Sequence, residues 1–238
     1  MSGLLLAVAV AAAAYVPLLQ PGDTVPAIPL VTQSARPFSF ADLRGSAVVV
    51  SFIYTRCPDP RMCPLTSSKF ARLQSELRGK PVQLVEITLD PAYDSPRVLR
   101  NYGRGFGADP ARWTLATGAE GSIDELAARF GVASRWTTPS TLVHTESVIV
   151  LDRANRLADS VDGNAWTPEQ IRDLALRASG ATPSFITRAS LWLGAAVQSC
   201  SGGRGSITGL EGLALIAVLV AASLTWFIRS TFAERPLP

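Results

Sequence analysis

The sequence predicts an α/β domain in which helices flank a mixed β-sheet, with a membrane-spanning helix on either side of that domain. Three observations lead to this prediction. Apolar, β-branched runs alternate with helix-like segments through the middle of the 238-residue chain. Two of these segments begin with a hydroxyl residue followed by proline, a common helix start. Uncharged apolar runs occupy residues 3–19 and 212–228.

The two apolar runs set the predicted organisation of the chain. Each approaches the roughly 20 residues that cross a bilayer, and small residues at positions 11–14 leave a cleaved signal peptide as the alternative for the first. Arg229 follows the second run, and cations stay on the cytoplasmic side, so the domain between the runs is expected on the periplasmic side of the cell membrane. Five parts result: a membrane anchor or signal-like helix (1–20), the α/β domain (21–179), a linker with a short apolar helix (180–206), a transmembrane helix (207–229) and a cytoplasmic tail (230–238).

The first half of the domain has the pattern of strand, helix and strand. After a proline-rich opening, residues 38–43 are predicted to form a short strand and turn. Residues 47–54 have the length and β-branched content of a buried strand. Residues 64–77 place apolar side chains close to one helical face, and Gly79 ends that helix. Residues 82–89 alternate and then run apolar, which predicts a half-buried strand.

The second half of the domain continues the alternation. Ser95, with Pro96 behind it, predicts the start of a helix that ends at about residue 106. Ser122 and Glu125 form a capping-box pattern for a helix over residues 122–130. Thr167 caps the last helix, over residues 168–178. The remaining segments are predicted strands, the last two joined as a hairpin: 113–117, 143–151 and 156–161.

Charge and glycine spacing exclude two classes of ligand. The net charge is +3 and the isoelectric point is near 9.0, but the cations are dispersed singly and form no basic run. We therefore expect no nucleic-acid partner. Gly103, Gly105 and Gly107 alternate without the spacing of a phosphate-binding loop, which argues against a nucleotide site.

Two cysteines and the only histidine carry the chemistry of the sequence. Cys57 and Cys63 lie between the predicted strand 47–54 and the helix that follows it. Unpaired N–H groups and the dipole at a helix start favour a thiolate over a thiol. Right-handed crossovers between parallel strands bring His144 to the same side of the sheet. Thiolates with an imidazole suit Cu(I), and a thiol pair also exchanges disulfides, so both functions are open.

The residues around these positions resemble the Sco/SenC family of thioredoxin-like copper-binding proteins, which serve the assembly of cytochrome c oxidase. Three blocks, in the family's order, carry the resemblance across about residues 22–178: Phe-Ile-Tyr-Thr-Arg-Cys-Pro-Asp with the later Cys-Pro, Ile-Thr-Leu-Asp-Pro-Ala-Tyr-Asp-Ser-Pro with Phe-Gly-Ala-Asp-Pro, and Val-His-Thr. Family members usually place three residues between the two cysteines, whereas this chain places five, Pro58-Asp-Pro-Arg-Met62.

The resemblance implies a fold, a ligand and partners. It implies a thioredoxin-like domain that binds copper, as Cu(I) or Cu(II), through Cys57, Cys63 and His144, and a partner in subunit II of cytochrome c oxidase or another respiratory complex. A thiol reductant partner is expected as well, because an oxidising compartment would otherwise oxidise the pair. The leading hypothesis is a membrane-anchored metallochaperone that delivers copper or maintains thiols. The alternatives are a metal-free thiol–disulfide oxidoreductase, with Cys57 and Cys63 as its catalytic redox pair, and a structural accessory subunit of a respiratory or photosynthetic membrane complex.

Several neighbouring residues receive secondary roles. A ligating imidazole must donate its other N–H to an acceptor, for which Asp59 and Glu146 are the candidates. Met62 can add a thioether to copper or can simply pack. The remaining assignments are structural: Asp90 and Asp94 shape and cap a junction, Tyr54 and Trp136 are core or wall residues, and Cys200 is a spectator thiol.

Overall fold

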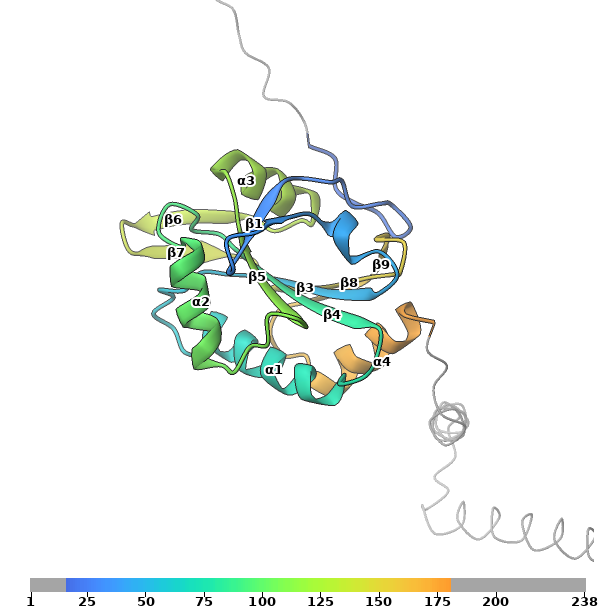
Figure 1. Ribbon diagram of the computed structural model, residues 1–238. Helices are drawn as coiled ribbons and strands as arrows, with labels where there is room; N and C mark the ends of the chain where they lie inside the picture. The colour runs from blue at the N-terminus through green and yellow to red at the C-terminus, as the bar shows by residue number, and fades with distance from the viewer. Residues whose placement is uncertain (1–15, 181–238) are drawn as a thin grey trace, which may run out of the picture. The chain divides into compact units, whose positions relative to one another are not determined.

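A computed structural model of the protein describes residues 16–180 (Figure 1). The predicted linker, the C-terminal membrane segment, the tail and Cys200 lie outside the described residues, as does the predicted N-terminal segment up to residue 15. Residues 16–20 form no helix, and the Leu19 N–H donates to the Arg129 carbonyl oxygen at 2.8 Å. Within residues 16–180, no helix combines the length and the apolar character needed to cross a bilayer.

A seven-stranded mixed sheet forms the centre of the domain, as the sequence predicts. Its spatial order is β2 (Pro37–Phe38), β1 (Leu30–Thr32), β5 (Trp113–Thr117), β4 (Val82–Thr88), β3 (Ala47–Ile53), β8 (Ser147–Leu151) and β9 (Leu157–Asp162). Strands β3, β4 and β5 run parallel, and the four outer strands pair antiparallel with their neighbours. The three parallel strands therefore end at the same edge of the sheet, where the loops that carry function are expected.

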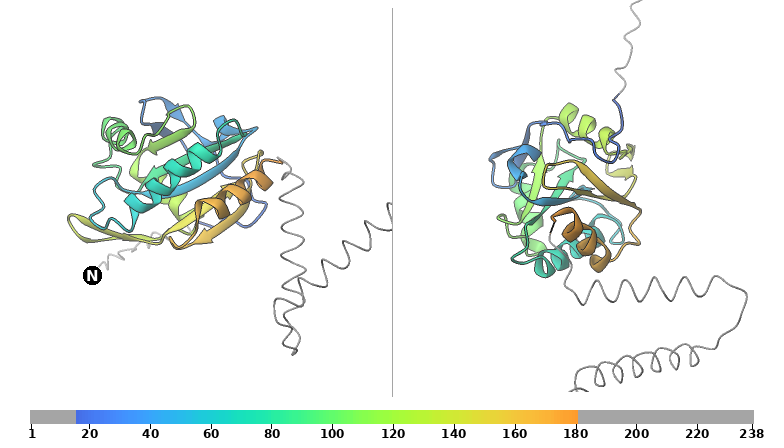
Figure 2. Two further views of the ribbon diagram at one scale, coloured as in Figure 1. Left: turned by 90° about the horizontal axis from the view of Figure 1, so that it is seen from below. Right: turned by 90° about the vertical axis from the view of Figure 1, so that its right-hand side faces the viewer.

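Helices cover both faces of this sheet (Figure 2). On one face, α1 (Cys63–Glu76) and α4 (Pro168–Ala178) lie side by side, with α2 (Pro96–Gly105) beside them. The other face is covered by α3 (Glu120–Arg129) and the 3₁₀ helix η1 (Phe40–Leu43). Every residue of β3 is buried, because Val48 and Val50 pack toward α3 while Ala47 and Val49 pack toward α1 and α4. This two-sided burial explains the continuous apolar run in the sequence.

The predicted strand over residues 143–151 is wrong as a single element. The structure breaks it into β7 (Thr141–His144) and β8, and β7 pairs with β6 (Ser134–Thr138) in a separate two-stranded sheet. This hairpin projects from the main sheet in Figure 1. Leu142 and Val143 give β7 an apolar stretch close to that of β8, so the sequence pattern does not show that the two strands pair with different partners. The break turns His144 out of the main sheet.

Of the three predicted helix caps, two are confirmed and one is wrong. Ser95 and Thr167 cap α2 and α4 as predicted, and each hydroxyl oxygen accepts from the N–H group three residues later, at 3.4 and 3.3 Å. The capping box predicted at Ser122 is wrong, because α3 already begins at Glu120 and the Ser122 N–H donates to the Ala119 carbonyl oxygen. Ser122 therefore lies inside the helix.

Candidate metal and thiol site

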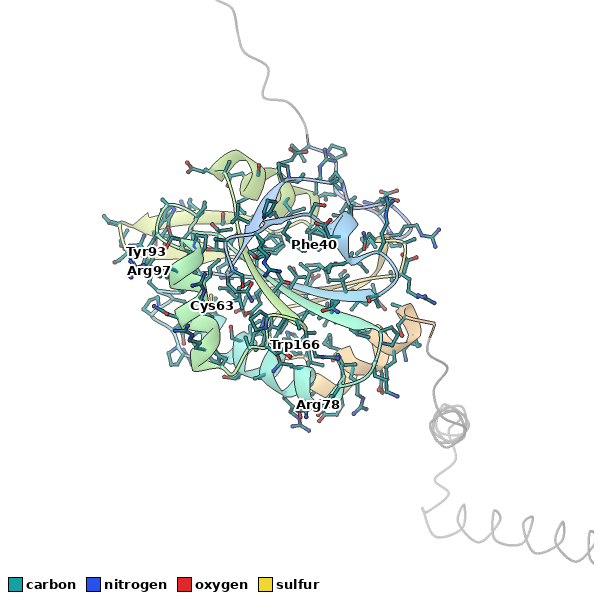
Figure 3. The ribbon with its side chains drawn as sticks, viewed as in Figure 1. Phe40, Cys63, Arg78, Tyr93, Arg97 and Trp166 are labelled. Carbon is teal, nitrogen blue, oxygen red and sulfur yellow. The ribbon has the colours of Figure 1, made fainter. Side chains whose placement is uncertain are left out.

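The fold brings His144 to Cys63. Strand β3 ends at Ile53 and leads into the loop that carries Cys57, while Cys63 is the first residue of α1. His144 is the last residue of β7, and its Nε2 lies 3.5 Å from the Cys63 Sγ, although 81 residues separate the two in the chain. Both side chains are buried, and Cys63 is labelled in Figure 3.

A carbonyl oxygen fixes the protonation of His144. Its Nδ1 lies 3.0 Å from the Thr145 carbonyl oxygen, which can only accept, so Nδ1 carries the hydrogen. Burial lowers the pKa of His144 and keeps the ring neutral. Nε2 then presents a lone pair toward the Cys63 sulfur, as a metal ligand requires. The acceptor is thus the Thr145 backbone and not Asp59 or Glu146; no sequence signal marks it, because every residue has a carbonyl group.

Cys57 is the thiol that favours the charged form. A hydrogen bond from the Cys63 thiol is the largest cause that lowers its pKa, to about 5, and backbone N–H groups of Cys63 and Asp59 act in the same direction against the effect of burial. The Cys63 N–H opens α1, so the start of the helix does stabilise a thiolate. That thiolate belongs to Cys57 and not to the cysteine that begins the helix.

Cys63 is held as the neutral partner. Its role as hydrogen-bond donor to Cys57 and its burial both raise its pKa, and it is only 1% exposed. Both cysteines are free thiols in this structure. At neutral pH the pair therefore shares one proton, with the charge on the more accessible sulfur of Cys57.

The three predicted ligands form two contacting pairs, Cys63 with His144 and Cys63 with Cys57. The Cys63 sulfur contacts the Nε2 of His144, and the Cys63 thiol donates to the Cys57 sulfur. Within residues 16–180, no group of three or more His, Cys, Asp or Glu side chains is arranged as a metal site. The donor types, two sulfurs and an unprotonated imidazole nitrogen, suit a soft metal such as Cu(I).

Two aromatic rings line the site. Tyr54 is buried, as predicted, and its ring meets the His144 and Trp136 rings edge-on, with centroid distances of 6.1 and 6.2 Å. Burial raises the pKa of Tyr54 to about 12, so its hydroxyl keeps its proton and donates to Cys57. Trp136 is 42% exposed and is therefore a wall residue, not a core residue.

Arg56, which sequence reasoning missed, joins this wall to the loop before α2. Its guanidinium lies 4.8 Å from the Tyr93 ring centroid and 5.1 Å from that of Trp136, and its Nε donates to Asp90 at 2.6 Å. Asp94 accepts from the Thr55 N–H at 3.0 Å and from the Thr88 hydroxyl. Asp90 and Asp94 thus hold the junction together, as predicted, but neither caps α2, because its N-cap is Ser95.

Glu86 is a second residue that sequence reasoning missed. It is fully buried on β4, and the Ser67 hydroxyl of α1 donates to it at 2.8 Å. Burial raises the pKa of Glu86 to about 8, although that hydrogen bond lowers it. The signal in the sequence is a single acid within a mostly apolar strand. Because Ser67 lies one turn after Cys63, this acid belongs to the interior beneath the cysteines.

Known proteins share both the sequence pattern and the fold. A Stutzerimonas stutzeri protein, described as a candidate copper-binding protein, is 40% identical over 92 residues, which are 37% of this chain and 44% of that protein. The structure of Arabidopsis thaliana ScoI with copper bound matches at 20% identity with a TM-score of 0.57, over 67% of this chain and 98% of that one. BsSco, described with a disulfide switch as a member of the Sco family of cytochrome c oxidase assembly proteins, matches at 22% identity and a TM-score of 0.59, over 69% and 99%.

The extent of these matches determines what they show. The chain spans about half the length of the first curated relatives it matches, from 44% to 51%. The structural matches establish the fold, which is the thioredoxin-like α/β fold of the Sco structures, as predicted. The SCO1/SenC family model matches residues 18–178, more than half of the chain. The protein therefore belongs to the SCO1/SenC family.

Proposed function

We propose that this chain is a membrane-anchored copper-binding protein that takes part in the assembly of cytochrome c oxidase. The observation that carries the proposal is the approach of the His144 Nε2 to the Cys63 Sγ, 3.5 Å across 81 residues of sequence. The Cys57 thiolate completes a soft donor set next to this pair. Support also comes from the copper-binding description of one relative and the copper-bound structure of another.

Each of the three proposed ligands has its own role in binding copper. His144 offers Nε2 because the Thr145 carbonyl oxygen holds the hydrogen on Nδ1. Cys57 is already charged at neutral pH, and Cys63 releases its proton when the metal's positive charge replaces it. Copper is the cargo in this proposal, and subunit II of cytochrome c oxidase or another respiratory complex is the proposed recipient.

Replacing His144 tests the ligand set. The full chain, purified in detergent with Cys200→Ser, should bind about one copper ion, and His144→Ala should abolish the Cu(II)–thiolate absorption because the imidazole nitrogen is lost. Asp59→Asn is the matched control, since Asp59 bonds locally to Arg61 and should leave the absorption unchanged. An unchanged spectrum in a folded His144→Ala protein would remove His144 from the ligand set.

Membrane attachment rests on the apolar runs at residues 3–19 and 212–228. In this proposal they anchor the domain on the periplasmic side and leave the C-terminus in the cytoplasm. A membrane-impermeant thiol reagent applied to intact cells should then label Cys57, which is the more exposed of the two site cysteines. Labelling that appears only after the cells are lysed would contradict this orientation.

Thiol–disulfide exchange is the second candidate, and the unequal thiols favour it. The Cys57 thiolate would attack a partner disulfide, form a mixed disulfide and release one partner thiol. Cys63 would lose its proton and attack the Cys57 sulfur, which releases the second partner thiol and leaves the Cys57–Cys63 disulfide, so two electrons pass to the partner. Metal-free protein that reduces a small disulfide with turnover, when a small dithiol is supplied to reduce the Cys57–Cys63 disulfide after each cycle, and Cys63→Ala protein that stops at the mixed disulfide, would establish this activity.

A further inference from the structure

The five-residue cysteine loop, residues 58–62, has one distant hydrogen-bond partner. The Asn164 amide donates to the Arg61 carbonyl oxygen at 2.7 Å. The other hydrogen bonds of the loop are local, such as those from the Met62 N–H to Asp59 and from the Thr66 N–H to Met62. In the part of the chain that the structure describes, Asn164 is therefore the only hydrogen-bonding residue that ties this loop to a remote element.

Asn164 belongs to a short segment, residues 163–166, that also holds the histidine loop. The Gly163 N–H donates to the Glu146 carbonyl oxygen at 2.7 Å, and Glu146 follows His144 by two positions. Gly163 has a φ angle of +76°, which a residue with a side chain adopts only at a cost. The turn between β9 and α4 is thus shaped so that its first two residues reach the two loops that carry His144 and the cysteines.

Helix α1 fastens the other end of this segment. The Lys69 ammonium donates to the carbonyl oxygens of Asn164 and Trp166, the latter at 2.9 Å, and lies 4.5 Å from the Trp166 ring centroid. Trp166 is itself buried and packs against Phe70, with a centroid distance of 6.3 Å. The segment is therefore anchored to the helix that begins with Cys63.

We propose that residues 163–166 form a strap that positions the two cysteines and His144 relative to one another, with Asn164 as the positioning residue that holds the long cysteine loop. The proposal rests on the proposed function of the site in copper or thiol chemistry. Without this strap, a loop with five residues between its cysteines would sample more conformations, and Cys57 would spend less time beside Cys63. The strap thus compensates for the length of the loop.

Asn164→Asp tests the strap with little change in shape. It removes the amide donor and keeps the size of the side chain, and Asn101→Asp, at an exposed position on α2, is the control for the added charge. In a Cys200→Ser background, Asn164→Asp should raise the copper dissociation constant about fivefold, the usual effect of one hydrogen bond, and should lower the Cu(II)–thiolate absorption. The thermal midpoint should stay close to that of Asn101→Asp.

A metal-free measurement separates the strap from copper binding. In glutathione buffers, the equilibrium constant for forming the Cys57–Cys63 disulfide should fall about fivefold in Asn164→Asp, because a loosened loop lowers the effective concentration of one thiol at the other. Lys69→Met, which releases the strap from α1, should also lower the equilibrium constant for disulfide formation. If the wild type binds no copper but this shift appears, the strap stands and the copper function fails. If both variants match Asn101→Asp in the disulfide equilibrium, the strap is refuted.

Discussion

Replacing Cys63 with alanine should make Cys57 less reactive than in the wild type at low pH and more reactive than in the wild type at high pH. The hydrogen bond from Cys63 is the largest cause of the low pKa of Cys57, about 5. In Cys63→Ala that donor is gone, while burial still raises the pKa of Cys57 and the backbone N–H groups and the Tyr54 hydroxyl still lower it. The pKa of Cys57 should then return toward the ordinary cysteine value of about 8.5. Alkylation by iodoacetamide reports this change directly, because only the thiolate reacts.

Two opposing effects set the size of the change. At about pH 6, a thiol with a pKa near 5 is about 90% ionised, and one with a pKa near 8.5 about 0.3%, a ratio of about 300. The nucleophilicity of a thiolate rises with its pKa, with a Brønsted coefficient of about 0.45. The thiolate with the higher pKa is therefore about 40-fold more reactive than the one with the lower pKa. Cys63→Ala should therefore react about eightfold more slowly at about pH 6 and about 40-fold faster at about pH 10.

The assay needs Cys200 removed and the labelled position identified. A Cys200→Ser background leaves Cys57 as the only thiol in Cys63→Ala, and peptide mass spectrometry confirms the site of alkylation in the wild-type pair. Cys63→Ser is the informative control, because its hydroxyl still donates and should keep the midpoint low. If the midpoint stays near pH 5 in Cys63→Ala, the Cys63 thiol is not what stabilises the thiolate.

Two further predictions concern the interior beneath the site. The folded-state pKa of Glu86, about 8, lies above its unfolded value. The free energy of unfolding therefore falls as pH rises from about 4.5 to 8, because the unfolded chain loses this proton first. Glu86→Gln should therefore gain stability over wild type through that window, by at most about 5 kcal/mol above it, and a gain that does not depend on pH in urea unfolding would contradict the assignment. Phe70→Ala, which opens a cavity between Trp113 and Trp166, should cost about 3 to 5 kcal/mol of unfolding free energy; a loss below about 1 kcal/mol would show that the core refills.

The sequence was sufficient for most of the central sheet. Strands β3, β4 and β5 lie within a residue of their predicted ranges, because a strand covered on both faces is mostly apolar and this pattern is local. The helix starts at Ser95 and Thr167 were predictable for the same reason, since a cap and the N–H group it serves lie three residues apart. The hairpin β6–β7 was not predictable from the sequence, because its pairing depends on which strand occupies the edge of the main sheet.

The site shows the same division. Cys57, Cys63 and His144 could be chosen as candidates from the sequence, because few side chains provide sulfur or imidazole and these three lie beside predicted element ends. Which thiol carries the charge could not be predicted. The low pKa of Cys57 depends on a donor six positions away and on how far each sulfur is buried.

What the sequence determined by itself was therefore the set of reactive groups and the α/β class, since both follow from residue type and short-range periodicity. Only the tertiary structure decided that the Thr145 carbonyl oxygen orients the imidazole and that Asn164 holds the cysteine loop. These contacts use backbone carbonyl groups, which every residue has. Their partners are chosen by the packing of distant elements, and no local pattern of side chains records that choice.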